Sequence, residues 1–233
     1  MDKSQKQVKT VNELGMAIEL VNHPIRLIAS GRSTMGKTTL AVDIMLTRLL
    51  PSVRRCYAVC PTFYDQPQLQ RLRSIKNAFP KSNVFTKVND AVFEYIYQQL
   101  KKDPKPTLLF VDDAAAERAT NRGNKGAFSR LCLASPHLNL TIVGCFQRLS
   151  SASPALRDNA EVLLSFQPTK LLDVETIVKE FNPCPTAKNS CNNTKAALQH
   201  AWSKRMFAFI YRVPRGPVNM YAAFDEQINI SQA

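Results

Sequence analysis

The sequence lacks any apolar run close to the ~20 residues that a membrane-spanning helix requires. Its N-terminal stretch, MDKSQKQVKT, is polar and lacks the apolar centre of a secretory signal peptide. Both absences argue against a membrane or secreted protein, and we expect a soluble protein that stays inside a cell. The chain of 233 residues is long enough for one sizeable domain with a complete core, and short for two.

Paired cysteine motifs are also missing, because the six cysteines contain no CxxC spacing. Cys56 and Cys60 lie in or beside an apolar run, which favours buried, reduced thiols. The alternative is a zinc site made by Cys184, Cys191 and His200, although their spacing fits such a site poorly.

Acidic residues are scarce in two long stretches of a chain whose formal net charge is +13. The only acid between Thr47 and Asn89 is Asp65, and the stretch from Asn182 to Phe224 has none. Such a surplus favours a polyanionic partner, because neutralising phosphates releases counterions. We expect the C-terminal stretch to line a nucleic-acid groove; a generally basic, solvated surface is the alternative. The basic residues of this stretch are Lys188, Lys195, Lys204, Arg205, Arg212 and Arg215.

Strand and helix patterns alternate along the chain. Short apolar runs predict strands at Pro24–Ala29, Arg55–Cys60, Asn83–Thr86, Thr107–Val111, Leu138–Phe146, Glu161–Phe166, Met206–Val213 and Asn219–Phe224. Helical spacing predicts helices at Thr38–Leu50, Gln66–Phe79, Ala91–Lys102 (capped by Asp90), Ala127–Ala134, Pro154–Asn159, Asp173–Phe181 and Thr194–Ser203. This order predicts an α/β fold: a mainly parallel central sheet flanked by helices, with a C-terminal antiparallel hairpin that extends one edge.

The stretch IASGRSTMGKTT, residues 28–39, has the Gly-x-x-x-x-Gly-Lys-Thr spacing of a Walker A loop. Glycines let backbone N–H groups surround phosphate oxygens, the lysine reaches the terminal phosphates, and the following hydroxyl can ligate Mg²⁺. We therefore predict an ATP site with Lys37 as a catalytic residue and Thr38 as a metal ligand. The predicted nucleotide-binding residues are Gly31, Arg32, Ser33, Thr34, Met35, Gly36, Lys37, Thr38 and Thr39.

The run TLLFVDD supplies the acidic partner that such a loop needs. Its apolar residues indicate a buried strand, and its two acids follow at the carboxyl end, where ligands bind in open α/β sheets. We predict that Asp112 ligates Mg²⁺, through a water, and that Asp113 is the general base for the attacking water. The alternative is that one of these carboxylates simply caps a helix.

A third strand, LNLTIVGCF, ends in Gln147, which we predict to be catalytic. Its amide could sense the γ-phosphate or orient water between the strand before the Walker A loop and the strand TLLFV, whose two following acids form the Walker B motif. An exposed loop glutamine is the alternative. An extra strand inserted between those two strands separates motor ATPases from small kinases and GTPases. The chain has no NKxD-like guanine motif, which weakens the GTPase alternative. The segment Arg118–Arg130 could imitate the lid of a kinase, so that alternative stays open.

Taken together, GRSTMGKTT, TLLFVDD, SPHLNLTIVGCFQ and the following LRDNAEVLLSFQP resemble the viral genome-packaging ATPases of the FtsK–HerA class. The resemblance covers roughly residues 24–168, and Arg157-Asp158-Asn159-Ala160 matches the segment that follows the glutamine in such proteins. It implies a homo-oligomeric ring, pentameric or hexameric, that uses ATP and Mg²⁺ to pump double-stranded DNA into a preformed capsid. It also implies a portal or capsid-vertex partner, no membrane, and the cytoplasm of a host cell.

The resemblance also implies an arginine donated by the neighbouring subunit. Candidates are Arg118, Arg122, Arg130 and Arg157, and we favour Arg130. The second Walker B acid departs from the wider class, in which glutamate is common. Aspartate is shorter than glutamate, so the attacking water must lie nearer the strand for Asp113 to act as its base.

We expect three parts: an N-terminal segment (residues 1–23), a P-loop ATPase core (24–168), and C-terminal helices and a hairpin (169–233) that complete the same domain. Two other functions remain open. One is a nucleotide-gated DNA-binding or assembly switch without motor activity, and the other is a small P-loop kinase.

Overall fold

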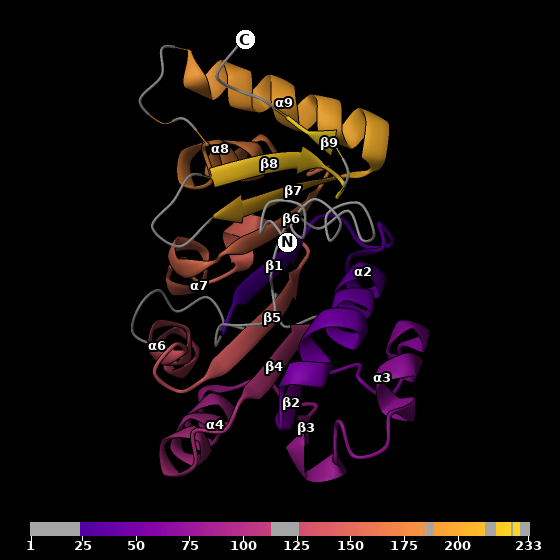
Figure 1. Ribbon diagram of the computed structural model, residues 1–233, viewed down its shortest axis with the longest axis vertical. Helices are drawn as coiled ribbons and strands as arrows, with labels where there is room; N and C mark the ends of the chain where they lie inside the picture. Colours follow the sequence, from indigo (N-terminus) through magenta and orange to yellow (C-terminus); the bar gives the residue numbers. More distant parts are fainter. Residues whose placement is uncertain are drawn as a thin grey trace, which may run out of the picture.

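The computed structural model describes residues 24–112, 126–183, 185, 189–212, 218–224 and 226–228. The strands of this part of the chain form one sheet in the order β3-β2-β4-β5-β1-β6-β7-β8-β9 (Figure 1). No helix within the described ranges is long and apolar enough to cross a lipid bilayer.

The sheet has a parallel part and an antiparallel edge. The parallel strands are β1 (Arg26–Ser30), β2 (Arg55–Val59), β3 (Val84–Phe85), β4 (Thr107–Asp112), β5 (Leu140–Phe146) and β6 (Val162–Phe166). The antiparallel strands are β7 (Phe207–Arg212), β8 (Val218–Ala222) and β9 (Glu226–Gln227). This arrangement confirms the predicted mainly parallel sheet with a C-terminal antiparallel extension.

Helices cover both faces of the sheet (Figure 1). One face carries α4 (Asp90–Lys102), α6 (Ala127–Ala134), α7 (Pro154–Asn159), α8 (Leu171–Glu180) and α9 (Ser190–Arg205). The other carries α2 (Lys37–Ile44), the π-helical turn η1 (Met45–Leu49), the 3₁₀ turns η2 (Leu50–Ser52) and η3 (Pro67–Leu69), and α3 (Gln70–Ser74). Two further 3₁₀ turns are η4 (Lys81–Asn83) and η7 (Leu149–Ser151).

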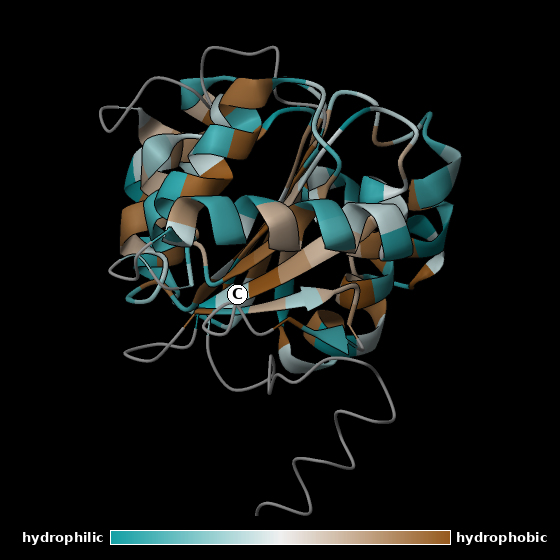
Figure 2. Cartoon of the chain, turned by 90° about the horizontal axis from the view of Figure 1, so that it is seen from above, coloured by the Kyte–Doolittle hydropathy of each residue, from teal (hydrophilic) through white to brown (hydrophobic). Residues whose placement is uncertain are grey.

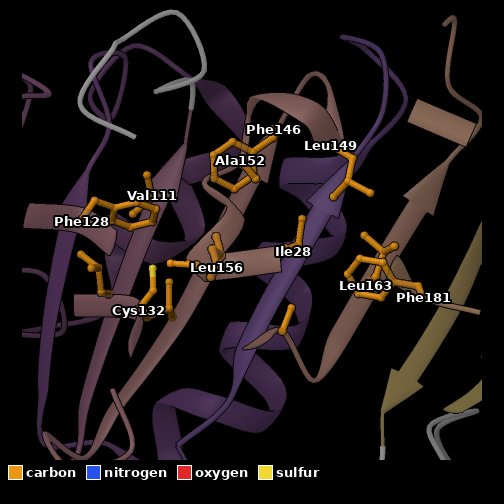
Figure 3. Packing of buried hydrophobic residues seen from close by; sticks show 14 of the residues in the cluster. Ile28, Val111, Phe128, Cys132, Phe146, Leu149, Ala152, Leu156, Leu163 and Phe181 are labelled. Atoms are coloured by element: carbon orange, nitrogen blue, oxygen red, sulfur yellow. The ribbon is translucent and has the colours of Figure 1, made fainter. Parts of the chain in front are cut away.

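Two apolar layers hold these helices on the sheet. Alternate residues of one strand serve opposite layers: Ile28 packs under α6 and α7, whereas Leu27 and Ala29 pack under α2. Every residue of β4 and β5 is buried, as expected for parallel strands covered on both faces. Figure 2 shows the apolar strands between helices of mixed polarity. Figure 3 shows Phe146 beside Ala152 in the layer that also contains Ile28.

Two helices end earlier than predicted. The helix expected at Gln66–Phe79 is α-helical only from Gln70 to Ser74, because the backbone of Ile75 is extended, and Asn77, with φ of 65°, then adopts a left-handed conformation. The helix expected at Thr38–Leu50 is α-helical only to Ile44 and continues as η1. Pro51 then has no N–H to donate to the preceding turn.

The cap of α4 also differs from the prediction. The Asn89 side chain accepts a hydrogen bond from the backbone N–H of Val92 at 3.0 Å, so Asn89 is the N-cap. Asp90 is the first helical residue, and its Oδ1 accepts from the N–H of Ala127, 3.3 Å away, which links α4 to the start of α6.

Arg212 points into the fold, although the sequence had placed it among the expected DNA-facing residues. Its guanidinium donates to three carbonyls at the C-terminal end of α7, at 3.0 to 3.3 Å, and to the carbonyl of Glu180 at the end of α8. It also lies 3.9 Å from the ring centre of Phe181. Burial lowers its pKa. This side chain neutralises two negative helix ends and ties β7 to α7 and α8.

We expect Arg212→Met to lower the free energy of unfolding by about 2–4 kcal/mol, because these carbonyls lose a charged donor. Urea denaturation followed by circular dichroism measures the change. The matched control is Lys204→Met, which removes an exposed cation 3.9 Å from Glu226 and is expected to change the stability by less than about 0.5 kcal/mol. Equal effects of the two variants would contradict the assignment.

Candidate functional site

The Walker A loop connects β1 to α2 at the carboxyl edge of the sheet. The N–H of Gly31 donates to the carbonyl of Phe146 at 3.2 Å, which joins the start of the loop to the end of β5. Gly36 has φ of 88° and ψ of 10°, and its carbonyl accepts from the N–H of Leu40 at 2.9 Å. Because left-handed geometry at Gly36 turns the chain into α2, the N-terminal amides of this helix face the cavity described next.

A cavity of about 280 Å³ lies at this edge of the sheet. The Walker A loop and α2 contribute to its wall, together with residues after β2, at the end of β4, and at and just after the end of β5. The lining residues are Ser33, Thr34, Lys37, Thr38, Gln66, Gln68, Asp112, Cys145 and Gln147. Three predicted motifs that are far apart in the sequence therefore meet at one cavity.

Lys37 and the pair Thr38–Asp112 lie at the centre of the site. Lys37 is only 8% exposed, and its Nζ donates to the carbonyl of Arg32 at 2.6 Å, so the ammonium lies within the curve of the loop. Thr38 Oγ1 donates to Asp112 Oδ2 at 3.2 Å, and Asp112 is 5% exposed. A hydroxyl and a carboxylate side by side are the oxygen ligands that Mg²⁺ prefers, so these two residues fit the predicted metal.

Gln147 follows the last residue of β5 and lines the same cavity. The floor next to it contains Cys145, which is paired in register with Asp112. Burial raises the pKa of the Cys145 thiol well above its usual value, and the charge of Asp112 adds to this effect. Cys145 therefore remains a neutral thiol, and the polar chemistry of the site comes from the Gln147 amide, the Asp112 carboxylate and the Lys37 ammonium.

Comparison with known proteins shows which solved structures have a similar fold. No protein-family model matches the chain, and no curated protein matches its sequence. Its fold is similar to the genome-packaging NTPase B204 from Sulfolobus turreted icosahedral virus 2 in complex with AMP, with 15% identity and a TM-score of 0.55 over 88% of this chain and 94% of that one. The DNA-packaging ATPase B204 from Sulfolobus turreted icosahedral virus gives 14% identity and a TM-score of 0.57, over 83% and 95%.

A third similar structure is the pCW3 conjugation coupling protein TcpA with ATPγS, at 13% identity and a TM-score of 0.57, over 88% of this chain and 61% of that one. The chain has the fold of a P-loop NTPase. At the level of fold, these matches confirm the resemblance to genome-packaging ATPases.

Several other predicted site residues do not line the cavity or lie outside the described residues. Asp113, Arg118 and Arg122 lie outside the described residues, as does Cys184 of the alternative zinc site. Arg32, Met35 and Thr39 belong to the loop and to the first turn of α2 but do not line the cavity.

Neither remaining arginine candidate lines the cavity of its own chain. Arg130 on α6 donates to Glu94 at 2.5 Å and lies 5.9 Å from the ring centre of Tyr97, with about half of its side chain exposed. Arg157 is largely buried and forms a two-pronged ion pair with Glu180, at 2.8 and 3.1 Å. These contacts give Arg157 a structural part in joining α7 to α8, whereas Arg130 lies on the exposed side of α6.

Gln66 and Gln68 were missed as site residues, since the sequence pattern placed Gln66 at the start of a basic helix. Gln66 is instead the N-cap of η3, Gln68 lies within η3, and both line the cavity. The position of β2 beside β4 brings them there, because the carboxyl ends of parallel neighbours lie at the same edge.

Gly31 has a packing reason to be glycine. Its φ is 147°, and an added Cβ would lie 2.5 Å from Phe166 Cβ at the end of β6. Because Phe166 Cβ is held by the strand, shortening the Phe166 side chain would not relieve this clash.

We expect Gly31→Ala to weaken ATP binding at least about 10-fold and to destabilise the fold by about 1–3 kcal/mol, because the loop must move away from β6. Equilibrium titration with a fluorescent ATP analogue measures the affinity. Gly144→Ala is the matched control: its Cβ would meet the outer edge of the Phe146 ring, so stability falls while affinity is kept. Normal affinity in Gly31→Ala would show that the loop tolerates the displacement.

Proposed function

We propose that this chain is an ATPase that couples ATP hydrolysis to the movement of double-stranded DNA, and that its work is packaging a viral genome into a preformed capsid. The observation that carries the ATPase part is the convergence of Lys37, Thr38, Asp112 and Gln147 on one polar cavity. The packaging part is supported by the similar folds of two proteins described as packaging NTPases or ATPases.

Each residue has a distinct role in this proposal. Lys37 and the amides at the start of α2 bind the β- and γ-phosphates, and Thr38 and Asp112 hold Mg²⁺, which neutralises charge on the phosphates when bound. Gln147 orients the attacking water, and Asp113 accepts its proton. Arg130 of a neighbouring subunit in a ring stabilises the γ-phosphate charge.

The strand order favours this proposal over a small kinase. Strand β5 lies between β1, which carries the Walker A loop, and β4, which carries Asp112. This inserted strand is the feature expected of motor ATPases, and it places Gln147 between the two motifs. The nucleotide-gated switch has the same site, so only the rate of hydrolysis and its response to DNA separate it from a motor.

The domain limits belong to the same proposal. Residues 24–168 form the catalytic core, residues 169–233 complete the same sheet, and residues 1–23 precede it. Two hydrogen-bonded ladders support a continuous unit, because β7 pairs with β6 of the core and β8 pairs with β7.

We expect Lys37→Ala to lower ATP turnover by at least about 100-fold, because the γ-phosphate loses its cationic partner in the transition state. Phosphate release measures the rate, and circular dichroism checks that the fold is intact. The control is Lys76→Ala, which removes an exposed lysine outside the cavity and keeps basal turnover. Turnover at the parent rate in Lys37→Ala would refute the ATPase assignment.

We expect duplex DNA to stimulate the ATPase, with little preference for sequence and a steep dependence on salt. Phosphate contacts release counterions, so the apparent DNA affinity should fall at least about 10-fold between roughly 50 and 200 mM salt. Phosphate release across duplexes of different sequence measures this effect, and light scattering gives the particle mass. Slow hydrolysis that is unchanged by DNA would favour the switch.

A further inference from the structure

The segment between β2 and η3 adds a second amide to the phosphate cavity. Gln66 lines this cavity with Lys37, Asp112 and Gln147, although no nucleotide-binding motif includes it. The following inference rests on the proposed ATPase function and names a further residue of that site.

The strand order fixes the side from which Gln66 reaches the cavity. Strand β2 is next to β4, β4 is next to β5, and β5 is next to β1. The residues at the edge therefore follow in the order Gln66, Asp112, Gln147 and the Walker A loop. Gln66 therefore lies on the far side of Asp112 from the Walker A loop, and Gln147 lies between Asp112 and that loop.

Hydrogen bonds hold the turn that carries Gln66. Its backbone N–H donates to the carbonyl of Thr62 at 3.0 Å. Arg73 reaches back from α3, and its Nη1 donates to the carbonyls of Phe63 at 2.7 Å and of Gln66 at 3.0 Å. The backbone of the turn is thus fixed before any ligand binds, which is the condition for orienting a small reactant.

The side chain is held as well. Gln66 Nε2 donates to Thr62 Oγ1 at 2.6 Å. This bond uses one of the two N–H donors of the amide, whose Oε1 can only accept hydrogen bonds. An acceptor cannot bind a phosphate oxygen, but it suits a water molecule, which must donate while its oxygen lone pair points at phosphorus.

We propose that Gln66 is a further catalytic residue, whose Oε1 accepts a hydrogen bond from the attacking water while Gln147 holds that water from the other side. In this step the water oxygen forms a bond to the γ-phosphorus, and the bond from phosphorus to the β–γ bridging oxygen breaks. The electron pair of that bond leaves with ADP, and the proton of the water passes to Asp113.

The test compares Gln66→Ala with Gln70→Ala, which changes an exposed glutamine on α3 outside the cavity. We expect Gln66→Ala to lower kcat at least about 10-fold while the Kd for a non-hydrolysable ATP analogue stays within about 3-fold, because only the water loses a partner. Gln70→Ala should match the parent chain in both quantities. Thermal unfolding checks that the two variants are equally folded.

A second pair of variants tests whether Thr62 holds the Gln66 side-chain amide in place. Thr62→Val removes the acceptor for Gln66 Nε2 and should lower kcat less than Gln66→Ala does, whereas Thr62→Ser keeps the hydroxyl and should stay near the parent rate. The inference is overturned if Gln66→Ala keeps kcat within about 2-fold, or if it weakens analogue binding as much as it slows turnover.

The two proposals fail differently. If the parent chain does not hydrolyse ATP, the proposed function falls, and the role of Gln66 falls with it. If the parent chain hydrolyses ATP and Gln147→Ala slows it while Gln66→Ala does not, only the inference about Gln66 is wrong.

Discussion

The hydrogen bond from Thr38 Oγ1 to Asp112 Oδ2, 3.2 Å long, joins the two halves of the nucleotide site. Thr38 lies in the first turn of α2, and Asp112 ends a fully buried strand, β4, that is not a neighbour of β1, the strand before the Walker A loop. Strand β5 fills the space between them, and its register with both neighbours sets their relative height. The cavity exists because three parallel strands end together at this point.

The C-terminal strands and helix support this edge of the sheet. Phe166 of β6 packs against Gly31 at the start of the loop, and its ring lies 5.3 Å from that of Phe207 on β7. Trp202 of α9 donates through Nε1 to the carbonyl of Ser165 at 2.9 Å. Because these contacts converge on the residues beside Gly31, the segment after residue 168 contributes to the shape of the phosphate site as well as extending the sheet.

Local sequence was sufficient for the type and order of the elements, although two helices end earlier than predicted, and the motif residues Lys37, Thr38, Asp112 and Gln147 line one cavity. The bounds of α6 and α7 match the prediction, and α7 begins where Ser153 caps it and Pro154 follows. Gln66 could not be found in this way, because its place depends on which strands are neighbours, and no local pattern contains that information. The inward direction of Arg212 likewise depends on the antiparallel pairing of β7 with β6.

The chemistry of the cavity indicates which part of a nucleotide it recognises. Among the described residues, those that line it are polar or charged apart from Cys145, whereas pockets for drug-like ligands are mostly apolar. Charged and amide groups at such a surface bind phosphates and water, and they offer a flat base little to stack on. The cavity is therefore suited to the phosphate end of a nucleotide, and on the proposed function the DNA partner is recognised by the basic surface outside it.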